Sequence, residues 1–168
     1  PLGTNAPPFR LPNVVNDEMQ ELNQLKGVKG TLIIFMCNHC PYVVASVDRM
    51  NKMSEYCKSN QIGFVGINSN DASVYANDSF EHMVKRAKNG MPYAYLYDES
   101  QEIAHSYGAK RTPEFFLFNS DNTLVYRGRM DDSPKDPSLA TTSELFDAVK
   151  ALISNKNLIT SGSKEIFQ

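Results

Sequence analysis

Two cysteines separated by two residues, Cys37 and Cys40, carry the clearest chemistry in this sequence of 168 residues. Two thiols at this spacing are able to close and reopen a disulfide bond. The apolar run Thr31–Met36 precedes them and indicates a buried strand, whereas Pro41 and apolar residues at helical spacing follow them. The pair therefore lies where a strand ends and a helix begins.

That position predicts a different role for each sulfur. Unpaired N–H groups and the positive end of a helix dipole stabilise a thiolate, so we expect a lowered pKa for Cys37, the attacking sulfur. Cys40, further into the helix, would then resolve the mixed disulfide. His39 is placed to bring an imidazolium or an N–H group near the Cys37 thiolate, which makes the disulfide a better oxidant. The disulfide is itself the redox group, so we expect no further cofactor.

A structural zinc site is the alternative interpretation of such a cysteine pair. Zinc sites of this kind need a second pair of ligands at finger-like spacing. The other candidate ligands, Cys57, His82 and His105, stand alone and far apart in the sequence. We therefore expect no bound metal.

The composition predicts one enzyme-like domain spanning residues 1–168. The apolar content of 41% is enough for a substantial core, and three cysteines are too few for a disulfide framework. A formal net charge of −2 favours neither nucleic acid nor an anionic membrane as partner. We find no apolar stretch of membrane-spanning length and no signal peptide. These features predict a cytoplasmic protein, or a periplasmic or exported one if a leader preceded Pro1.

The remaining patterns predict alternating strands and helices. The predicted strands that follow the cysteines are Gln61–Ile67, Tyr93–Tyr97, Glu114–Phe118 and Thr123–Arg127, the last two as a hairpin. The predicted helices are the one after Cys40, Asp78–Lys88 with Asn77 or Asp78 as its N-cap, Glu99–Tyr107, and Ser143–Ile153. Before them, 1–30 forms an N-terminal extension, with Pro1–Pro12 extended and Glu18–Lys26 helical or in a turn. Residues 154–168 form a C-terminal tail.

Five motifs and their order carry a family resemblance. The motifs are Phe35–Val43, which holds the cysteine pair, Gly66–Asp71, Asp78–Glu81, Tyr97–Glu99 and Val125–Ser133. Together they resemble bacterial peroxiredoxin-like proteins of the thioredoxin family, which are grouped with the alkyl hydroperoxide reductase/thiol-specific antioxidant set. The resemblance covers about Gly3 to Ile153. It implies an α/β thioredoxin-like fold, with a central mixed β-sheet flanked by helices, an N-terminal extension and an inserted helix.

The resemblance also implies where a substrate binds. Thr112-Pro113 falls where the thioredoxin fold keeps a cis-proline beside the first cysteine, although an ordinary trans-proline opening a strand is the alternative. The backbone of Thr112 would pair with an extended substrate chain by strand addition. Asn38, inside the cysteine motif, is expected to contact the substrate as well. A histidine before the second cysteine resembles the motifs of protein disulfide isomerase and of the periplasmic oxidase DsbA, which implies a potential of about −120 to −230 mV.

The sequence departs from its relatives in two ways. Relatives often carry a further cysteine just before the Thr-Pro pair, where this chain has Arg111, so we expect no second redox pair. Arg111 either lowers the pKa of Cys37 or is a solvated loop arginine. The buried acid that thioredoxin keeps beneath its cysteines has no counterpart in Thr31–Met36. Glu114, next to the proline, is either a proton acceptor for Cys40 or a plain solvent-exposed residue.

Three functions fit these residues. The leading hypothesis is a thiol–disulfide oxidoreductase acting on protein or small-molecule thiols and disulfides, with an unidentified electron donor. The second is a thiol-dependent peroxidase with Cys37 oxidised by peroxide and Cys40 condensing with it, an antioxidant activity. Against it, peroxiredoxins place Pro and Thr ahead of the cysteine, where this chain has Gly30 and Ile34. The third is a binding module that keeps the fold without turnover.

Overall fold

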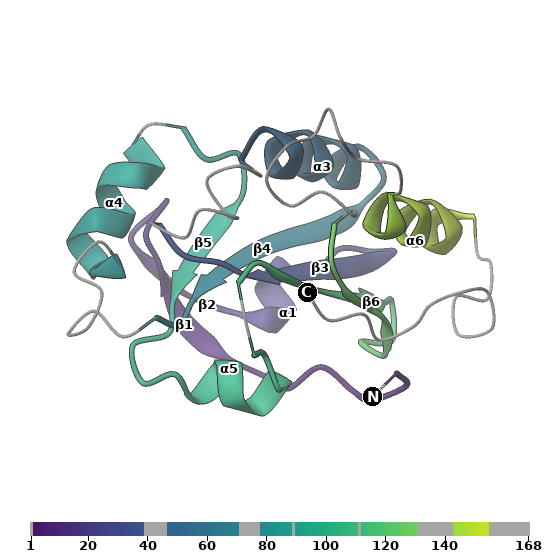
Figure 1. The fold of residues 1–168 in the computed structure, drawn as a ribbon, viewed down its shortest axis with the longest axis horizontal. Coiled ribbons are helices and arrows are strands. Elements are labelled where there is room, and N and C mark those ends of the chain that lie inside the picture. Colours follow the sequence, from purple (N-terminus) through teal and green to yellow (C-terminus); the bar gives the residue numbers. More distant parts are fainter. Residues whose placement is uncertain are drawn as a thin grey trace.

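Helices cover both faces of a seven-stranded β-sheet in the computed structural model of the chain (Figure 1). The structure describes residues 2–38, 47–70, 78–88, 90–110, 112–130 and 143–154. The strands are β1 (Arg10–Asn13), β2 (Glu18–Glu21), β3 (Gly30–Phe35), β4 (Ile62–Asn68), β5 (Ala94–Tyr97), β6 (Glu114–Asn119) and β7 (Leu124–Gly128). The helices are α1 (Leu22–Leu25), α3 (Val47–Ser59), α4 (Phe80–Lys88), α5 (Glu102–Tyr107) and α6 (Glu144–Ile153).

The strands lie in the order β2-β1-β5-β4-β3-β6-β7, and the sheet is mixed. β3, β4 and β5 run parallel to one another, whereas β6 and β7 continue the sheet on one side and β1 and β2 on the other as antiparallel strands. Every residue of β3 is buried, as its continuous apolar run predicts. The prediction of an α/β fold around a central mixed sheet is confirmed.

The side chains of β3 alternate between two cores. Leu32 and Ile34 belong to the larger cluster, which also contains residues of α3, α4 and α6. Ile33 and Phe35 belong to the smaller cluster, which includes residues of α1, α5 and the N-terminal segment. In Figure 1, α3 and α6 accordingly lie on one side of the sheet and α5 on the other. The two cores hold β3 firmly, so the residues that follow its carboxyl end start from a fixed position.

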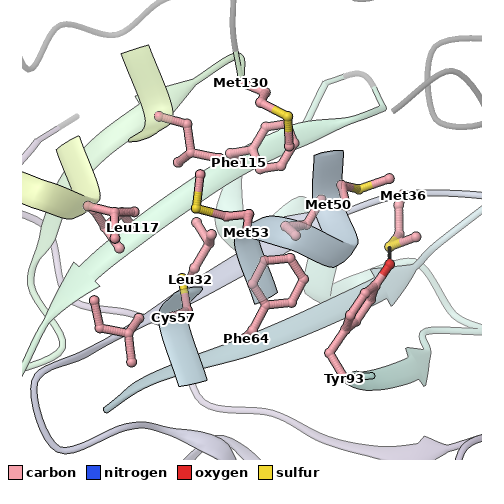
Figure 2. Close-up of a cluster of buried hydrophobic side chains, with 14 of the residues drawn as sticks. Leu32, Met36, Met50, Met53, Cys57, Phe64, Tyr93, Phe115, Leu117 and Met130 are labelled. Carbon is pink, nitrogen blue, oxygen red and sulfur yellow. Dashed lines mark hydrogen bonds between the residues drawn. The ribbon is translucent and has the colours of Figure 1, made fainter. Parts of the chain in front are cut away.

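Methionine side chains fill much of the larger core (Figure 2). Met36, Met50 and Met53 are buried there beside Phe64, and the hydroxyl of Tyr93 lies 4.0 Å from the sulfur of Met36. The unbranched thioether adapts to irregular space, which suits a helix packed obliquely on a sheet. Met36 is the residue directly before Cys37, so this packing anchors the entry to the cysteine motif.

The N-terminal part differs from its prediction. Instead of one helical or turn segment at Glu18–Lys26, the chain forms β2 followed by α1, and the end of the predicted extended segment Pro1–Pro12 pairs with β2 as part of β1. Asp17, with a φ of 59°, turns the chain between the two strands. The prediction failed because β2 is a polar edge strand without apolar alternation, and its pairing with β1 rather than its own pattern decides its structure.

Two helix starts also differ. α5 begins at Glu102 rather than Glu99, because Gln101 has a φ of 65° and the side chain of Asp98 accepts hydrogen bonds from the backbone N–H groups of the first turn. The cap of α4 is Ser79, whose hydroxyl accepts the backbone N–H of His82 at 3.3 Å. Asp78, one of the two predicted caps, binds elsewhere, as shown below.

Within the described ranges, none of the helices combines the length and the apolar character that a bilayer crossing requires.

Burial of one thiol and four phenols gives the stability of the fold a defined dependence on alkaline pH. Desolvation raises the pKa of Cys57 from 9.0 to about 12. Burial also raises the pKa values of four tyrosines from 10.0: Tyr93, Tyr95, Tyr107 and Tyr126. The unfolded chain therefore ionises at a lower pH than the folded chain, so the stability from these groups is complete below pH 9 and declines as the pH rises. From Cys57 alone we expect the free energy of unfolding to fall by about 1.4 kcal/mol per pH unit above that point.

Urea unfolding between about pH 8 and about pH 10 measures this decline. Cys57→Ala is the matched control. It removes a sulfur from a packed site, so it lowers the free energy of unfolding at every pH. It should also flatten the first part of the decline, before the tyrosines contribute. An equally steep decline in Cys57→Ala would show that the buried thiol is not the cause.

Candidate functional site

Cys37 lies at the carboxyl end of the central strand β3. The backbone N–H of Met36 donates to the carbonyl of Ile67 on β4 at 2.9 Å, so the strand pairing continues up to the residue before the cysteine. Cys37 is completely buried, and its sulfur is part of a disulfide bond. The other described cysteine, Cys57, is a buried free thiol. The sheet therefore places an oxidised sulfur at the edge where strands β3 and β4 both end.

Thr112 faces the same sulfur. Its hydroxyl donates to Cys37 Sγ at 3.8 Å, and the peptide bond between Thr112 and Pro113 is cis. The pairing of the strands explains the contact, because β6 is antiparallel to β3 with Glu114 opposite Phe35. The residue just before β6 therefore reaches the place just after β3. The structure thus brings together the first cysteine and the Thr-Pro segment that the sequence predicts at one site.

A buried carboxylate, Asp78, holds the residue after Cys37. Its Oδ1 accepts the backbone N–H of Asn38 at 2.6 Å and the side-chain amide of Asn68 at 3.0 Å. Its Oδ2 accepts the side-chain amide of Asn70 at 3.1 Å. Asp78 has no exposed surface, so these charge-assisted hydrogen bonds lie in a medium of low dielectric constant. The end of β4 and the cysteine motif are thereby tied to one carboxylate.

Tyr95 of β5 extends this network to the side chain of Asn38. The amide of Asn68 donates to the Tyr95 oxygen at 3.2 Å, and the Tyr95 hydroxyl donates to Asn38 Oδ1 at 2.8 Å. Burial raises the pKa of Tyr95, an effect that the nearby Arg86 only partly opposes. The phenol therefore keeps its proton and remains a donor. Asn38 is held through its backbone and its side chain together.

Arg86, on α4, brings a positive charge to the same place. Its Nη1 donates to the backbone carbonyl of Cys37 at 3.1 Å, and its guanidinium carbon lies 5.7 Å from the centre of the Tyr95 ring. We call Asn38, Asn68, Asp78, Arg86 and Tyr95 the loop network. Through it, one cation and one anion each contact the backbone of the segment that holds the Cys37 sulfur.

Glu114, the predicted proton acceptor, is buried and already paired. It forms an ion pair with Arg127 at 2.9 Å, and its other oxygen accepts the backbone N–H of Lys110 at 2.8 Å. Arg127 also donates to the carbonyl of Gly108. The carboxylate therefore joins β6 to β7 and to the segment leading to Thr112. Whether it also serves Cys40 stays a prediction.

His39, Cys40 and Arg111 lie outside the described residues, so their predicted roles stay predictions. The expectation that no buried acid stands near the cysteines needs correction. Thr31–Met36 indeed contains none, but Asp78 supplies a buried carboxylate to the motif from the start of α4. The local pattern around Asp78 indicates a helix cap, and it carries no sign of a contact with a residue 40 positions away.

A pocket of about 300 Å³ opens beside Thr112. Phe35 lines it at the end of β3. The other walls come from the residues just after β4, from α5, and from the segment between α5 and β6. The polar groups in those walls are Ser69, Asn70, Gln101, His105 and Lys110. The pocket leaves open space next to the threonine that contacts the sulfur. Among the described residues, no cluster of three or more His, Cys, Asp or Glu side chains comes together as a metal-binding set.

Comparison with known proteins agrees with this geometry. Residues 1–144 match the Redoxin family. The chain belongs to the Redoxin family. A crystal structure of an uncharacterized conserved protein from Geobacillus kaustophilus is similar to this redoxin chain at 39% identity, with a TM-score of 0.91 over 99% of this chain and 87% of that one. The curated proteins give no match.

More distant solved structures share the fold of this redoxin. A putative thiol:disulfide interchange protein DsbE from Chlorobium tepidum is 20% identical, with a TM-score of 0.70 over 91% of this chain and 98% of that one. Peroxidoxin BcpB from Mycobacterium tuberculosis is 15% identical, with a TM-score of 0.67 over 91% and 96% of the two chains. The expected thioredoxin-like fold is confirmed, and membership of the Redoxin family supports a thiol redox function within the thioredoxin superfamily.

Proposed function

We propose that this redoxin is a thiol–disulfide oxidoreductase that cycles Cys37 and Cys40 between a disulfide and two thiols. The observation that carries the proposal is the oxidised, buried Cys37 sulfur beside the Thr112 hydroxyl, 3.8 Å away. The chain has three cysteines and Cys57 is a free thiol, which leaves Cys40 as the partner within the chain. No other cofactor is required, because the cysteine pair accepts two electrons as a disulfide and donates them as a dithiol.

The reaction follows from the two sulfurs. In the reducing direction, the Cys37 thiolate attacks a substrate disulfide, forming a mixed disulfide and releasing one substrate thiolate. The Cys40 thiolate then attacks the Cys37 sulfur, which releases the second substrate thiolate and closes the Cys37–Cys40 disulfide. A dithiol donor restores the reduced pair, and substrate oxidation is the reverse sequence. Protein or small-molecule thiols and disulfides are the proposed partners.

Thr112 and the pocket beside it provide the substrate position. An extended chain that pairs with the backbone of Thr112 would bring its own sulfur toward Cys37. Because Cys37 has no exposed surface in the oxidised form, an incoming thiol needs a local rearrangement before it reaches the sulfur. Asn38 and His39 complete the proposed site, Asn38 as a substrate contact next to the attacking sulfur and His39 as the group that favours its thiolate.

Insulin reduction with dithiothreitol tests the proposal, with hydrogen peroxide consumption measured on the same protein. We expect the wild-type chain to accelerate insulin reduction. Cys40→Ser should stop turnover and hold an insulin chain on Cys37 as a mixed disulfide, visible by mass spectrometry, because the resolving sulfur is gone.

The peroxidase alternative gives the opposite result in this assay. In that case Cys37 is oxidised by peroxide to a sulfenic acid, a step that does not need Cys40. Rapid first-turnover loss of peroxide that survives Cys40→Ser, together with no acceleration of insulin reduction, would replace our proposal with this alternative. If the chain neither reduces insulin nor consumes peroxide, the remaining function is a binding module without turnover.

A further inference from the structure

We propose that Arg86 and Asp78 form an opposed pair of charges that sets how strongly oxidising the Cys37 disulfide is, an inference that rests on the proposed function. Both residues act through the backbone of the cysteine motif, so they are positioning residues and not catalytic ones. Arg86 favours the Cys37 thiolate and hence the reduced protein. Asp78 disfavours the thiolate and hence favours the disulfide.

The position of Arg86 supports the first half. Its guanidinium donates at 3.1 Å to the carbonyl of Cys37, the residue that carries the sulfur, and it lies over the ring of Tyr95. Tyr95 is itself fixed by hydrogen bonds to Asn38 and Asn68. The positive charge is therefore held in one place beside the backbone of the residue that carries the sulfur. A fixed cation close to a thiol stabilises its thiolate.

The position of Asp78 supports the second half. Its carboxylate accepts the backbone N–H of Asn38 at 2.6 Å. This is the first amide after Cys37, one of the donors that would otherwise stabilise a thiolate at the start of the motif. Asp78 therefore engages an N–H group that would otherwise face a thiolate, and it places a negative charge at the first amide after Cys37. Both effects make the thiolate less favourable.

Burial makes the charge of Asp78 effective, and the partly exposed Arg86 acts on a buried segment. Cys37, Asp78 and Tyr95 have no exposed surface, so water screens the interactions little. Further described charges at the same end of the sheet include Glu114, which is paired with buried Arg127, Lys110, at the rim of the pocket, and buried Asp98, which accepts the Ser69 hydroxyl. The pair Glu114–Arg127 carries no net charge. Arg86 and Asp78 both contact the backbone of this segment directly, Arg86 at Cys37 and Asp78 at Asn38.

Equilibration with glutathione converts this electrostatics into a measurable constant. Two glutathione molecules supply two electrons and two protons to the Cys37–Cys40 disulfide, and glutathione disulfide is formed. One proton stays on Cys40 as a thiol. The other is released to solvent when Cys37 remains a thiolate. Anything that stabilises that thiolate moves the equilibrium toward the reduced protein and makes the disulfide a stronger oxidant.

The experiment measures the glutathione equilibrium constant and the pH profile of Cys37 alkylation by iodoacetamide in single variants. Arg86→Gln should raise the pKa of Cys37 and shift the equilibrium about tenfold toward the disulfide. Asp78→Asn should lower the pKa of Cys37 and shift the equilibrium about tenfold toward the dithiol. The two variants are therefore expected to move in opposite directions.

Matched controls separate this charge effect from damage to the fold. Lys85→Gln and Glu81→Gln make the same changes in net charge at exposed positions of the same helix, and we expect both to leave the constant unchanged. Arg86→Lys keeps the charge and should recover most of the wild-type value. The double variant Asp78→Asn/Arg86→Gln should return toward wild type, whereas structural damage would add up. Circular dichroism confirms that each variant is folded.

Equal shifts in the same direction for Arg86→Gln and Asp78→Asn would overturn the proposal, as would a shift in Lys85→Gln as large as that in Arg86→Gln. If Arg86→Gln or Asp78→Asn does not fold, Arg86→Lys and the two exposed controls carry the test. Loss of the wild-type equilibrium constant in Arg86→Lys would then count against the proposal. The failure of the proposed function looks different, because the wild-type chain itself would then show no exchange with glutathione.

Discussion

Cys37→Ser is expected to reduce thiol–disulfide exchange to the background rate, while Cys57→Ala keeps the wild-type rate. A serine hydroxyl does not form a disulfide, so neither the mixed disulfide nor the internal one is able to form. Cys37 is the sulfur that the sheet places beside Thr112. The rates of insulin reduction and of exchange with a small disulfide, such as Ellman's reagent, are measured for both variants and compared with the wild-type rates.

Cys57 is a stringent control because it is the free thiol among the described cysteines. It lies on α3 within the methionine-rich core, where burial raises its pKa to about 12 (Figure 2). At neutral pH it has almost no thiolate form, and the thiolate is the reactive species. Turnover that persists in Cys37→Ser would assign the chemistry to another sulfur. Turnover lost in a folded Cys57→Ala would mean that the core thiol takes part.

The parts of the site that depend on neighbouring residues were predictable from the sequence. The strand before the cysteines was predicted at Thr31–Met36 and is formed by Gly30–Phe35, because six successive apolar or β-branched residues have few other places in a soluble fold than a central strand. The hairpin formed by β6 and β7 was predictable for a similar reason, since Asn119 and the three residues after it form a turn between two apolar runs.

The loop network was not predictable in this way, because its members meet only through the order of the strands. Asn38 lies 40 positions from Asp78 and 57 positions from Tyr95 along the chain. The alternation at Tyr93–Tyr97 correctly indicates a strand, but it does not say that one hydroxyl reaches the cysteine motif. The available signals were the motifs Gly66–Asp71 and Asp78–Glu81, the first of which contains the asparagine-rich loop after β4, at the strand ends where α/β folds place their sites.

Replacing Glu114 by alanine is expected to lower the free energy of unfolding by about 3–5 kcal/mol, the largest effect on stability that we predict. Its partner Arg127 is buried as well, with side-chain exposures of 4% for Glu114 and 8% for Arg127. Without the carboxylate, the guanidinium is left as an uncompensated charge, packed against the ring of Phe116 at 5.0 Å. The backbone N–H of Lys110 also loses its acceptor. Urea unfolding measures the difference.

The pair Arg129–Glu144, which joins the residue after β7 to the start of α6, gives a control. Its side chains are 31% and 19% exposed, so water compensates part of what is lost, and Glu144→Ala should cost only about 1 kcal/mol. Replacing both members of the buried pair, as in Glu114→Leu/Arg127→Leu, removes the uncompensated charge and should recover much of the loss. Equal costs for Glu114→Ala and Glu144→Ala would contradict the argument.

The same ion pair connects stability to chemistry, because Glu114 directly follows Pro113 and binds the segment before Thr112 through Lys110. Glu114→Ala should therefore weaken the placement of Thr112 beside Cys37 even where the protein is still folded. We expect insulin reduction by Glu114→Ala to fall at temperatures well below its unfolding transition, whereas Glu144→Ala should lose activity only as it unfolds. Parallel loss of activity and structure in both variants would mean that the pair supports the fold alone.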